Sequence, residues 1–287
     1  MLYLYVMRVI QTALNIPDCH IPWHDRSAYD LMLEVAQAYN DKCGLDEINI
    51  MGDYIDMYWV NLHPKLPDHF TVKGTFKDEI QIACHELSRL RSLFPKARIR
   101  YIEGNHEYRL PRYLTAKAPE LFDIVSIKEL LQLDKHGIVY VPSGKTQIVP
   151  CLDTAYYLRH KPFSMSKHCA RATLDKKMTS LGFGHTHRKQ CATTTDALGK
   201  ELYGRSLGWL GDRLAPVFSF MDCDEWSQGF EFVVSEKRVP HHQYVDVRTI
   251  EATRSAVFDG HLYSLPYQKP YDGNYTKTQS VSSRSIA

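Results

Sequence analysis

The chain has 287 residues, 44% hydrophobic and 24% charged, so it has enough apolar material for one large domain or two small ones. Its formal net charge of +2 excludes a surface that is basic all over, and any groove for a polyanion must therefore be local. Fourteen histidines are the one unusual count, and histidine is the commonest transition-metal ligand at neutral pH.

The first half of the chain alternates short apolar runs with amphipathic stretches, the pattern of an α/β sheet. Asp25 or Ser27 is placed to cap the first helix, and Pro95 ends the second. Strands are predicted at residues 12–16, 47–51 and 98–102, and helices at residues 25–39 and 77–93.

The second half reads as short strands around one helix, followed by a polar tail. A helix is predicted at residues 165–177, and strands at 137–141, 146–149, 155–158, 179–183, 201–207, 217–221, 230–235 and 244–247. From Pro266 onward aliphatic residues are rare, which predicts a flexible tail over 266–287 behind a domain of residues 1–265. A sandwich of two sheets flanked by helices accommodates this order.

The cysteines and the N-terminus indicate the compartment. Seven scattered cysteines without a Cys-x-x-Cys pair argue against a disulfide framework or a structural zinc site and favour a reducing cytoplasm. The apolar run at residues 1–10 is too short to span a bilayer and lacks the charged start of a signal peptide. We therefore expect a cytoplasmic protein without a membrane partner.

Five polar motifs each follow a predicted strand. They are Asp18-Cys19-His20, Gly52-Asp53-Tyr54-Ile55-Asp56, Gly104-Asn105-His106-Glu107, His160 and Gly184-His185-Thr186-His187. The carboxyl ends of strands are the usual place of an α/β active site. Asp-x-His and His-x-His segments in extended conformation project both side chains to one side. The glycines before Asp53, Asn105 and His185 allow the backbone to approach an ion without a Cβ clash.

The residue types in these motifs indicate a transition-metal site. Carboxylate, imidazole and amide oxygen ligands suit manganese, iron, zinc or nickel, and no thiolate is needed. Two ions that share a bridging carboxylate lie about 3.5–4 Å apart and can clamp both the attacking and the leaving oxygen in phosphoryl transfer. Water bound to such an ion has a pKa of roughly 7, so hydroxide is available at neutral pH.

Together the motifs resemble the signature of the calcineurin-like metallophosphoesterase superfamily, D-x-H, G-D-x-x-D, G-N-H-[E/D], H and G-H-x-H, over residues 18–187. The segments at 104–111 (GNHEYRLP), 206–212 (SLGWLGD) and 225–230 (EWSQGF) are similar to phage-type and bacterial members. The resemblance implies a four-layered αββα sandwich of two mixed β-sheets. It also implies the cytoplasm of a bacterium or of a phage-infected host.

The resemblance also implies a role for each motif residue. One divalent transition-metal ion would be held by Asp18, His20 and His187, and a second by Asn105, His160 and His185, with Asp53 as the bridge. A hydroxide that bridges the two ions would attack the phosphorus. His106 would protonate the leaving group, and Asp56 would orient His106 and keep it protonated.

Departures from the family pattern bear on the substrate. Protein phosphatases of this superfamily follow the second motif with an arginine that grips phosphate, whereas Met57 follows Asp56 here. This favours a phosphodiester, in a nucleotide or nucleic acid, with Tyr54 in an aromatic rim that stacks a base; a position half in the core is the alternative for Tyr54. Arg109 is predicted to contact the substrate phosphate, with an ordinary solvated helix charge as the alternative.

Two further functions and one further ligand stay open at this point. The alternative activity is a phosphomonoesterase acting on a small metabolite. An inactive metal-dependent binding protein is disfavoured, because His106 and Asp56 are both retained. Lys161 follows His160 where many relatives have glycine, so His168, in a helical stretch, is the competing candidate for that ligand.

Overall fold

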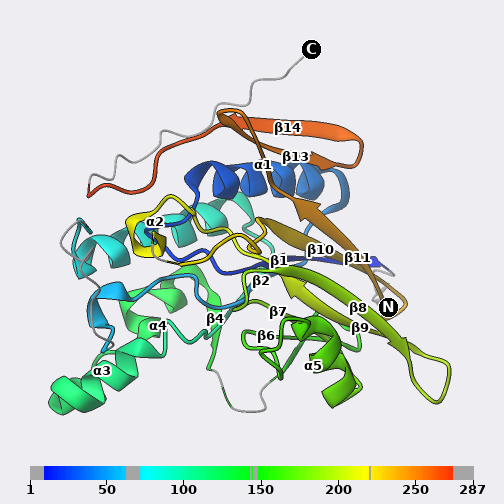
Figure 1. Cartoon of the computed structure of the whole chain (residues 1–287), viewed down its shortest axis with the longest axis horizontal. Coiled ribbons are helices and arrows are strands. Elements are labelled where there is room, and N and C mark those ends of the chain that lie inside the picture. The colour runs from blue at the N-terminus through cyan, green and yellow to red at the C-terminus, as the bar shows by residue number, and fades with distance from the viewer. Residues whose placement is uncertain (1–9, 63–71, 143, 145–147, 220, 274–287) are drawn as a thin grey trace, which may run out of the picture.

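The computed structural model describes residues 10–62, 72–142, 144, 148–219 and 221–273. The larger sheet has six strands in the order β11-β10-β1-β2-β3-β4. Strands β1 to β4 are parallel, and β10 runs antiparallel to both of its neighbours (Figure 1). Their bounds are Ile10–Ile16 for β1, Glu47–Ile50 for β2, Arg98–Ile102 for β3, Ile138–Val141 for β4, Gly229–Glu236 for β10 and Val239–Asp246 for β11.

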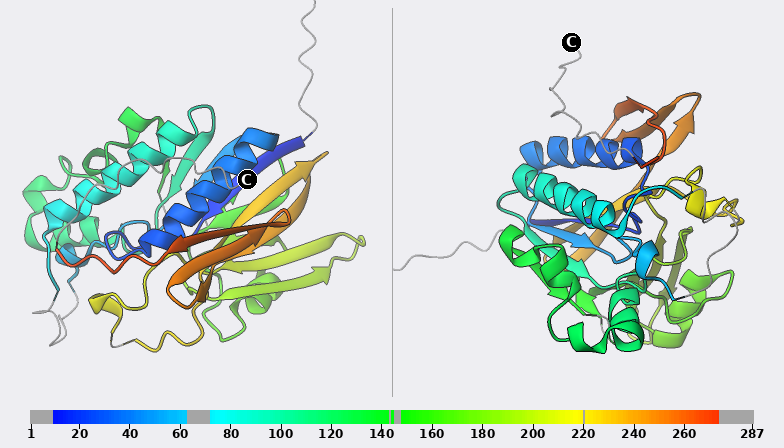
Figure 2. Two further views of the ribbon diagram at one scale, coloured as in Figure 1. Left: turned by 90° about the horizontal axis from the view of Figure 1, so that it is seen from above. Right: turned by 90° about the vertical axis from the view of Figure 1, so that its left-hand side faces the viewer.

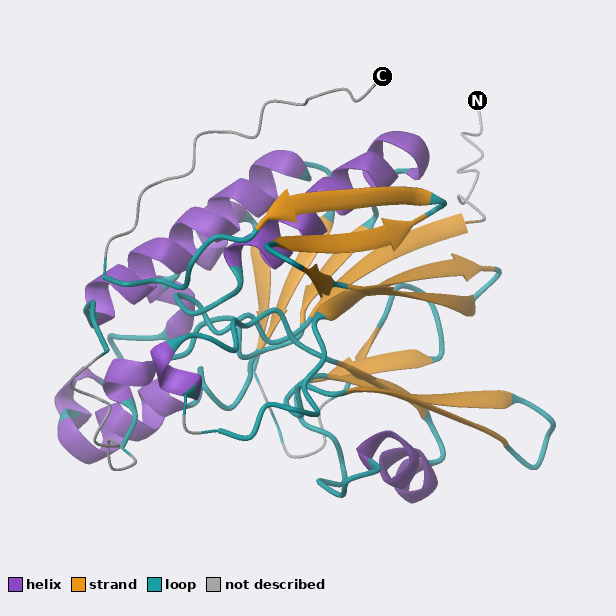
Figure 3. Cartoon of the chain, turned by 45° about the horizontal axis from the view of Figure 1, so that its top comes forward, coloured by secondary structure: helices purple, strands orange, loops and turns teal. Residues whose placement is uncertain are grey.

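A second, five-stranded sheet has the order β5-β6-β7-β9-β8. Its three inner strands are parallel, and β5 and β8 are antiparallel edges. The bounds are Val149–Pro150 for β5, Tyr156–Arg159 for β6, Ser180–Phe183 for β7, Lys189–Thr195 for β8 and Glu201–Leu207 for β9. A small antiparallel sheet of β12 (Arg248–Ile250), β13 (Thr253–Phe258) and β14 (His261–Pro266) lies beside the first helix (Figure 3).

The helices begin at polar caps. Asp25 accepts the backbone N–H of Ala28 at 3.0 Å and caps the first helix, and Thr75 and Asp78 form a capping box on the second. The α-helices are α1 (Arg26–Cys43), α2 (Phe76–Leu93), α3 (Arg109–Lys117), α4 (Ile127–Leu130) and α5 (Cys169–Lys177). Single 3-10 turns lie at Tyr58–Val60, Pro119–Leu121, Leu133–His136 and Pro216–Phe218.

Three apolar clusters separate the layers. The largest lies between α1, α2 and the six-stranded sheet, with Leu31, Leu87 and Ile48 among its buried residues. A second cluster fills the space between the two sheets, and a third packs α5 on the outer face of the five-stranded sheet. Helices, sheet, sheet and helix therefore follow one another (Figure 2). The expectation of an α/β architecture with two mixed sheets is confirmed.

A buried carboxylate ties the two sheets together. Glu231 on β10 accepts hydrogen bonds from Asn15 of its own sheet at 2.9 Å and from Tyr156 and Arg205 of the other sheet at 3.1 and 2.5 Å. Burial raises the pKa of Glu231, but Arg205 and His242 outweigh burial and hold it at about 2. The charge is thus retained in the core, and the sheets are fixed relative to each other near the ligand-bearing strands.

Some predicted elements were wrong or incomplete. The strand predicted at 217–221 is a 3-10 turn at Pro216–Phe218, because Phe218 packs against Trp209 and Trp226 instead of pairing in a sheet. The helix predicted from residue 165 begins only at Cys169. Of the strand predicted at 146–149, only Val149 is in β5, and residues 146–147 lie outside the described residues.

The start of the predicted tail contacts the domain. The Tyr267 hydroxyl donates to Asp212 at 2.8 Å, the backbone N–H of Gln268 donates to Ser27 at 2.8 Å, and Tyr271 is buried. Residues 274–287 lie outside the described residues. Within the described part of the chain, no helix combines the length and the apolar character needed to cross a membrane.

Candidate metal centre

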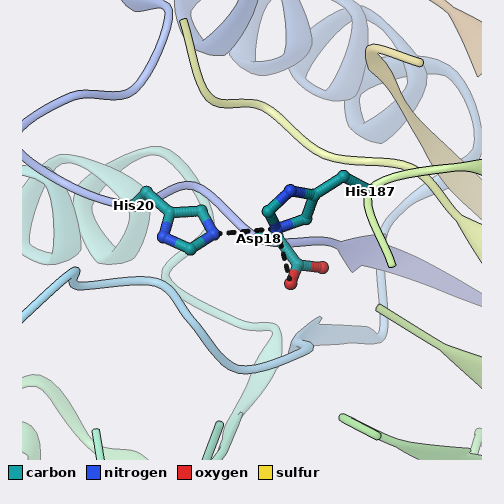
Figure 4. Close-up of side chains that lie close together, drawn as sticks. All are labelled: Asp18, His20 and His187. Carbon is teal, nitrogen blue, oxygen red and sulfur yellow. Dashed lines mark hydrogen bonds and ion pairs between the residues drawn. The ribbon is translucent and has the colours of Figure 1, made fainter. Parts of the chain in front are cut away.

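Two groups of potential metal ligands lie at the carboxyl ends of the strands. In the first, one ligand atom each from Asp18, His20 and His187 lies within 4.8 Å of the others. Asp18 and His20 follow β1 of the larger sheet, whereas His187 follows β7 of the smaller one (Figure 4). The facing Nε2 atoms of His20 and His187 are 3.0 Å apart.

The second group joins Asp53, His160 and His185 within the same 4.8 Å limit. The amide oxygen of Asn105 lies 2.9 Å from Nε2 of His160, which places the fourth expected ligand beside this group. Asp53 also lies within 4.8 Å of His20, a member of the first group. The structure thus brings all seven sequence-predicted ligands together, with Asp53 between the two groups.

The two carboxylates are held by backbone amides. Oδ1 of Asp18 accepts the N–H of His185 at 2.8 Å, and Oδ1 of Asp53 accepts the N–H of His106 at 2.8 Å. Oδ2 of Asp18 is buried without any hydrogen-bond partner in the described chain. Burial raises the pKa of Asp18 well above its ordinary value, so the charged carboxylate is costly here without a cation, and a bound metal ion would favour it.

The histidine tautomers also favour a cation. Nδ1 of His160 lies 3.0 Å from the carbonyl oxygen of Met51, which only accepts, so Nδ1 carries the proton. In neutral His160 the lone pair of Nε2 then faces two more acceptors, Oδ1 of Asn105 at 2.9 Å and Oδ2 of Asp53 at 3.2 Å. Three acceptors that converge without a donor require either a proton or a metal ion.

The pKa values agree with that reading. Burial lowers the pKa of His160, but Asp53 and Asp18 outweigh burial and raise it to about 9. A metal ion would replace that proton. Burial lowers the pKa of His20 and His187 and takes that of His185 to about 3. These three imidazoles are neutral at neutral pH, as metal ligands must be.

The local backbone is unusual at the ligands. His20, Asp53, His185 and His187 all have left-handed backbone conformations, with φ between +46° and +67°. Each such residue costs about 1–3 kcal/mol and persists only where the surrounding structure fixes it. A Cβ added at Gly184 would overlap Oδ2 of Asp18. The predicted need for a glycine beside the ligands is thus confirmed at this position.

His106 and Asp56 are paired as predicted. Nδ1 of His106 lies 3.2 Å from Oδ2 of Asp56, and the same oxygen lies 3.0 Å from Nδ1 of His20. Burial lowers the pKa of His106, but Asp53 and Asp56 outweigh it and raise the pKa above its ordinary value. Arg109 contacts both Asp56, at 3.1 Å, and Nε2 of His106, at 3.0 Å. Arg109 can only donate, so its contact with His106 is a hydrogen bond to Nε2 of the neutral ring. When His106 is protonated, Arg109 and Nε2 of His106 are both donors, and a substrate oxygen beside them could accept from both.

Two expected roles change. Tyr54 is fully buried and its hydroxyl lies 2.7 Å from that of Tyr29, so the prediction that it lines a substrate-stacking rim was wrong. Its ring packs in the core beside Tyr101. His168 is exposed and belongs to neither ligand group, so it does not compete with His160.

Several residues of the cleft were not found from the sequence. A cavity of about 280 Å³ opens on Asp53, His185 and His187, and its other walls include Met165, Arg188, Met221 and Trp226. Trp226 lies edge-on to His187, with ring centroids 4.3 Å apart. Arg188 directly follows a ligand, and that position in the fifth motif was the only signal that could have indicated it.

Glu107 organises the loops that carry the ligands. Its carboxylate accepts the backbone N–H groups of Asp53 and Gly104 on Oε2, at 3.0 and 2.8 Å. On Oε1 it accepts the N–H of Tyr54 at 2.9 Å and the hydroxyl of Tyr101 at 2.7 Å. This buried side chain therefore holds the second and third motifs together, a role that the sequence did not indicate.

Glu107→Gln is expected to destabilise the protein by about 3 kcal/mol, because the amide group would face backbone donors that need an acceptor. The melting temperature should fall by roughly 10 °C in thermal unfolding. Glu103→Gln is the matched control, since Glu103 accepts from the Tyr140 hydroxyl at 2.7 Å and an amide oxygen can do the same. Equal melting temperatures for the two variants would contradict the role given to Glu107.

In comparisons with known proteins, no family model matches the chain, and no curated protein matches it significantly. The case for a function therefore depends on the described residues themselves. Buried histidine and aspartate groups that could hold metal ions are the firm result.

Proposed function

We propose that the chain is a dinuclear-metal phosphoesterase of the calcineurin-like metallophosphoesterase type, and that it hydrolyses phosphodiesters. The observation that carries the proposal is the position of Asp53, within 4.8 Å of ligand atoms from both His20 and His160. A shared carboxylate between two groups of ligands is what a bridged pair of ions needs. The layer order of helices, sheet, sheet and helix supports the αββα metallophosphoesterase fold that the motifs resemble.

Each residue of the centre would have its own role in the reaction. When bound, the two ions would neutralise charge on the phosphate and favour deprotonation of the attacking water. Asp18 and Asp53 would hold the ions through carboxylates that backbone amides already orient. His106 would give its proton to the leaving oxygen, and Asp56 would keep the His106 ring in place and charged. Phosphate ester hydrolysis uses each of these groups.

A diester is favoured by the residue after Asp56. Met57 is fully buried with φ of 55°, so this position offers no side chain to a substrate phosphate. A monoester dianion gains more than a diester from a directed guanidinium, because bidentate arginine contacts are charge-assisted. The single charge of a diester depends less on such a contact.

A phosphomonoesterase is the second candidate, and Arg109 is the observation that favours it. Its guanidinium lies 3.0 Å from His106, where it could reach a phosphate oxygen. The Nη1 atom is already bound to the carbonyl oxygen of Asp56 at 2.7 Å, so a contact with phosphate would have to compete with that bond.

The test is a hydrolysis panel on protein reconstituted with manganese, with matched nitrophenyl diester and monoester substrates. We expect the diester rate to exceed the monoester rate, because Met57 stands where protein phosphatases have a phosphate-binding arginine. Arg109→Ala separates the two candidates. A faster monoester rate that collapses in Arg109→Ala would replace the first candidate by the second, and no hydrolysis of either substrate would reject both.

A further inference from the structure

Positive charge is concentrated in the segment that carries three of the ligands. Residues 159–189 contain eight lysines and arginines but one acidic residue, in a chain of net charge +2. Four of the cations are paired: Arg171 with Asp175, Lys167 and Arg188 with Glu225, and Lys189 with Asp246. The remaining four, which we call the Phe163 cluster, form no ion pair with a carboxylate among the described residues: Arg159, Lys161, Lys176 and Lys177.

Three of these cations contact one aromatic residue. The guanidinium carbon of Arg159 lies 3.8 Å from the ring centroid of Phe163, and Nζ of Lys177 lies 4.2 Å from it. Nζ of Lys176 donates to the carbonyl oxygen of Phe163 at 3.2 Å. The charges of Arg159 and Lys177 are therefore at most about 8 Å apart, within one Debye length at physiological salt, and they repel each other.

Arg159 has donors that nothing in the described chain satisfies. The residue is 9% exposed, and its buried Nε and Nη1 atoms have no hydrogen-bond partner among the described residues. A buried guanidinium normally pairs with a carboxylate or another acceptor. The ring of Phe163 compensates part of the charge, but it leaves the N–H groups unused. An anion at this place would satisfy these donors and relieve the repulsion.

The Phe163 cluster lies next to the metal centre along the chain. Arg159 and Lys161 directly flank the ligand His160. Lys161 lines a cavity of about 350 Å³ together with Asn105 and His160. The loop after His160 continues through Phe163 to Met165, which lines the metal cleft. A substrate that extends from the cleft across this loop would reach the cluster.

We propose that the Phe163 cluster binds a second phosphate of the substrate, and that the substrate is a nucleic acid strand. This inference rests on the proposed phosphodiesterase function, since it assigns the substrate class of the same centre. A strand supplies phosphates on both sides of the bond to be cleaved, and binding driven by lysine and arginine depends strongly on salt. The local excess of positive charge over a nearly neutral chain agrees with such a partner.

The test is the binding of a fluorescein-labelled thymidine strand of about twelve nucleotides, measured by anisotropy as salt is raised. The full-length protein is used in the His106→Ala background, so that the strand is not cleaved. Lys176→Gln with Lys177→Gln should weaken binding about tenfold at low salt, as expected for lost charge-assisted hydrogen bonds. The slope of log affinity against log salt should fall by roughly 1.4, the value for two lost phosphate contacts.

Arg171→Gln is the matched control, because it removes a cation from the same helix that is already paired with Asp175. It should change affinity less than about twofold, in line with an exposed ion pair. A double lysine variant that behaves like Arg171→Gln in affinity and slope would overturn the proposal. Since binding is read without turnover, this result is independent of whether the protein hydrolyses diesters.

Competition with thymidine 3′,5′-bisphosphate identifies the source of the phosphate. We expect the double variant, Lys176→Gln with Lys177→Gln, to change the affinity for this small nucleotide much less than the affinity for the strand. If the variant loses affinity equally for the nucleotide and for the strand, the cluster binds phosphate, but its assignment to a nucleic acid strand is overturned. The lysine and arginine substitutions replace exposed side chains, and melting temperatures equal to that of His106→Ala alone will show that each variant is folded.

Discussion

Asp53→Ala is expected to empty both metal positions and to lower phosphodiester turnover by about 10³-fold or more. Among the described residues, Asp53 alone belongs both to a group of three with His20 and to the group of three with His185. Loss of both ions would remove several kcal/mol of charge stabilisation from the transition state, and each 1.4 kcal/mol is a factor of ten. Elemental analysis of the purified variant gives the metal content directly.

Asp175→Ala is the control for this experiment, because Asp175 is exposed and forms a surface ion pair with Arg171, its one ion-pair partner in the described part of the chain. It should retain close to two ions per chain and its full activity. If Asp53→Ala keeps one tightly bound ion, Asp53 is a ligand of one position and the bridge is wrong. Wild-type protein that binds no metal and gains no activity with manganese would reject the centre altogether.

His106→Ala is expected to keep both ions and to lose about 10²–10⁴-fold in turnover, the usual contribution of a positioned proton donor. The pKa of His106 lies above its ordinary value because Asp53 and Asp56 outweigh the effect of burial, which favours the protonated ring that a proton donor needs. The loss should be smallest for nitrophenyl esters, whose leaving group is stable as an anion. An alkyl diester should show the full loss.

His106 has a competing role, that of a metal ligand. His106 forms a third close group with His20 and Asp53 within 4.8 Å, so it could itself bind metal. Metal analysis of His106→Ala decides between the roles: loss of an ion makes His106 a ligand, whereas two retained ions with slow turnover make it the proton donor. Asp56→Asn is a useful companion, since it should lower activity through the orientation of His106 and His20.

The sequence predicted which polar side chains come together better than it predicted their surroundings. Asp18, Asp53 and His185 could be found because ligand types recur directly after apolar runs that form strands, and that pattern is local. The role of Glu107 could not be found, because its five donors come from separate segments that meet only in the fold. Tyr54 was misassigned for the same reason, since its burial depends on the packing of α1.

Strands, too, were predicted where the sequence signal is local and missed where pairing depends on the rest of the fold. The parallel strands β1, β2 and β3 alternate buried isoleucine or leucine with polar residues, so their positions were evident within one or two residues. The edge strand β8, with the sequence KQCATTT, alternates exposed and half-buried residues and has little apolar signal. Strand β14 has the same alternation of exposed and half-buried residues, and β12, β13 and β14 were not predicted. Their pairing depends on neighbours that are distant in the chain or on turns with left-handed residues such as Asp259.

The division of ligands between the two sheets has a consequence for biosynthesis. Asp18 and His20 emerge early in translation, but their partner His187 follows about two thirds of the way along the chain. The second group likewise needs His160 and His185 from the later sheet. A ribosome-bound nascent chain that ends before residue 185 thus has neither ligand set complete. Metal loading of this centre would therefore follow the docking of the second sheet on the first, so that only a chain that has passed this folding step could receive its ions.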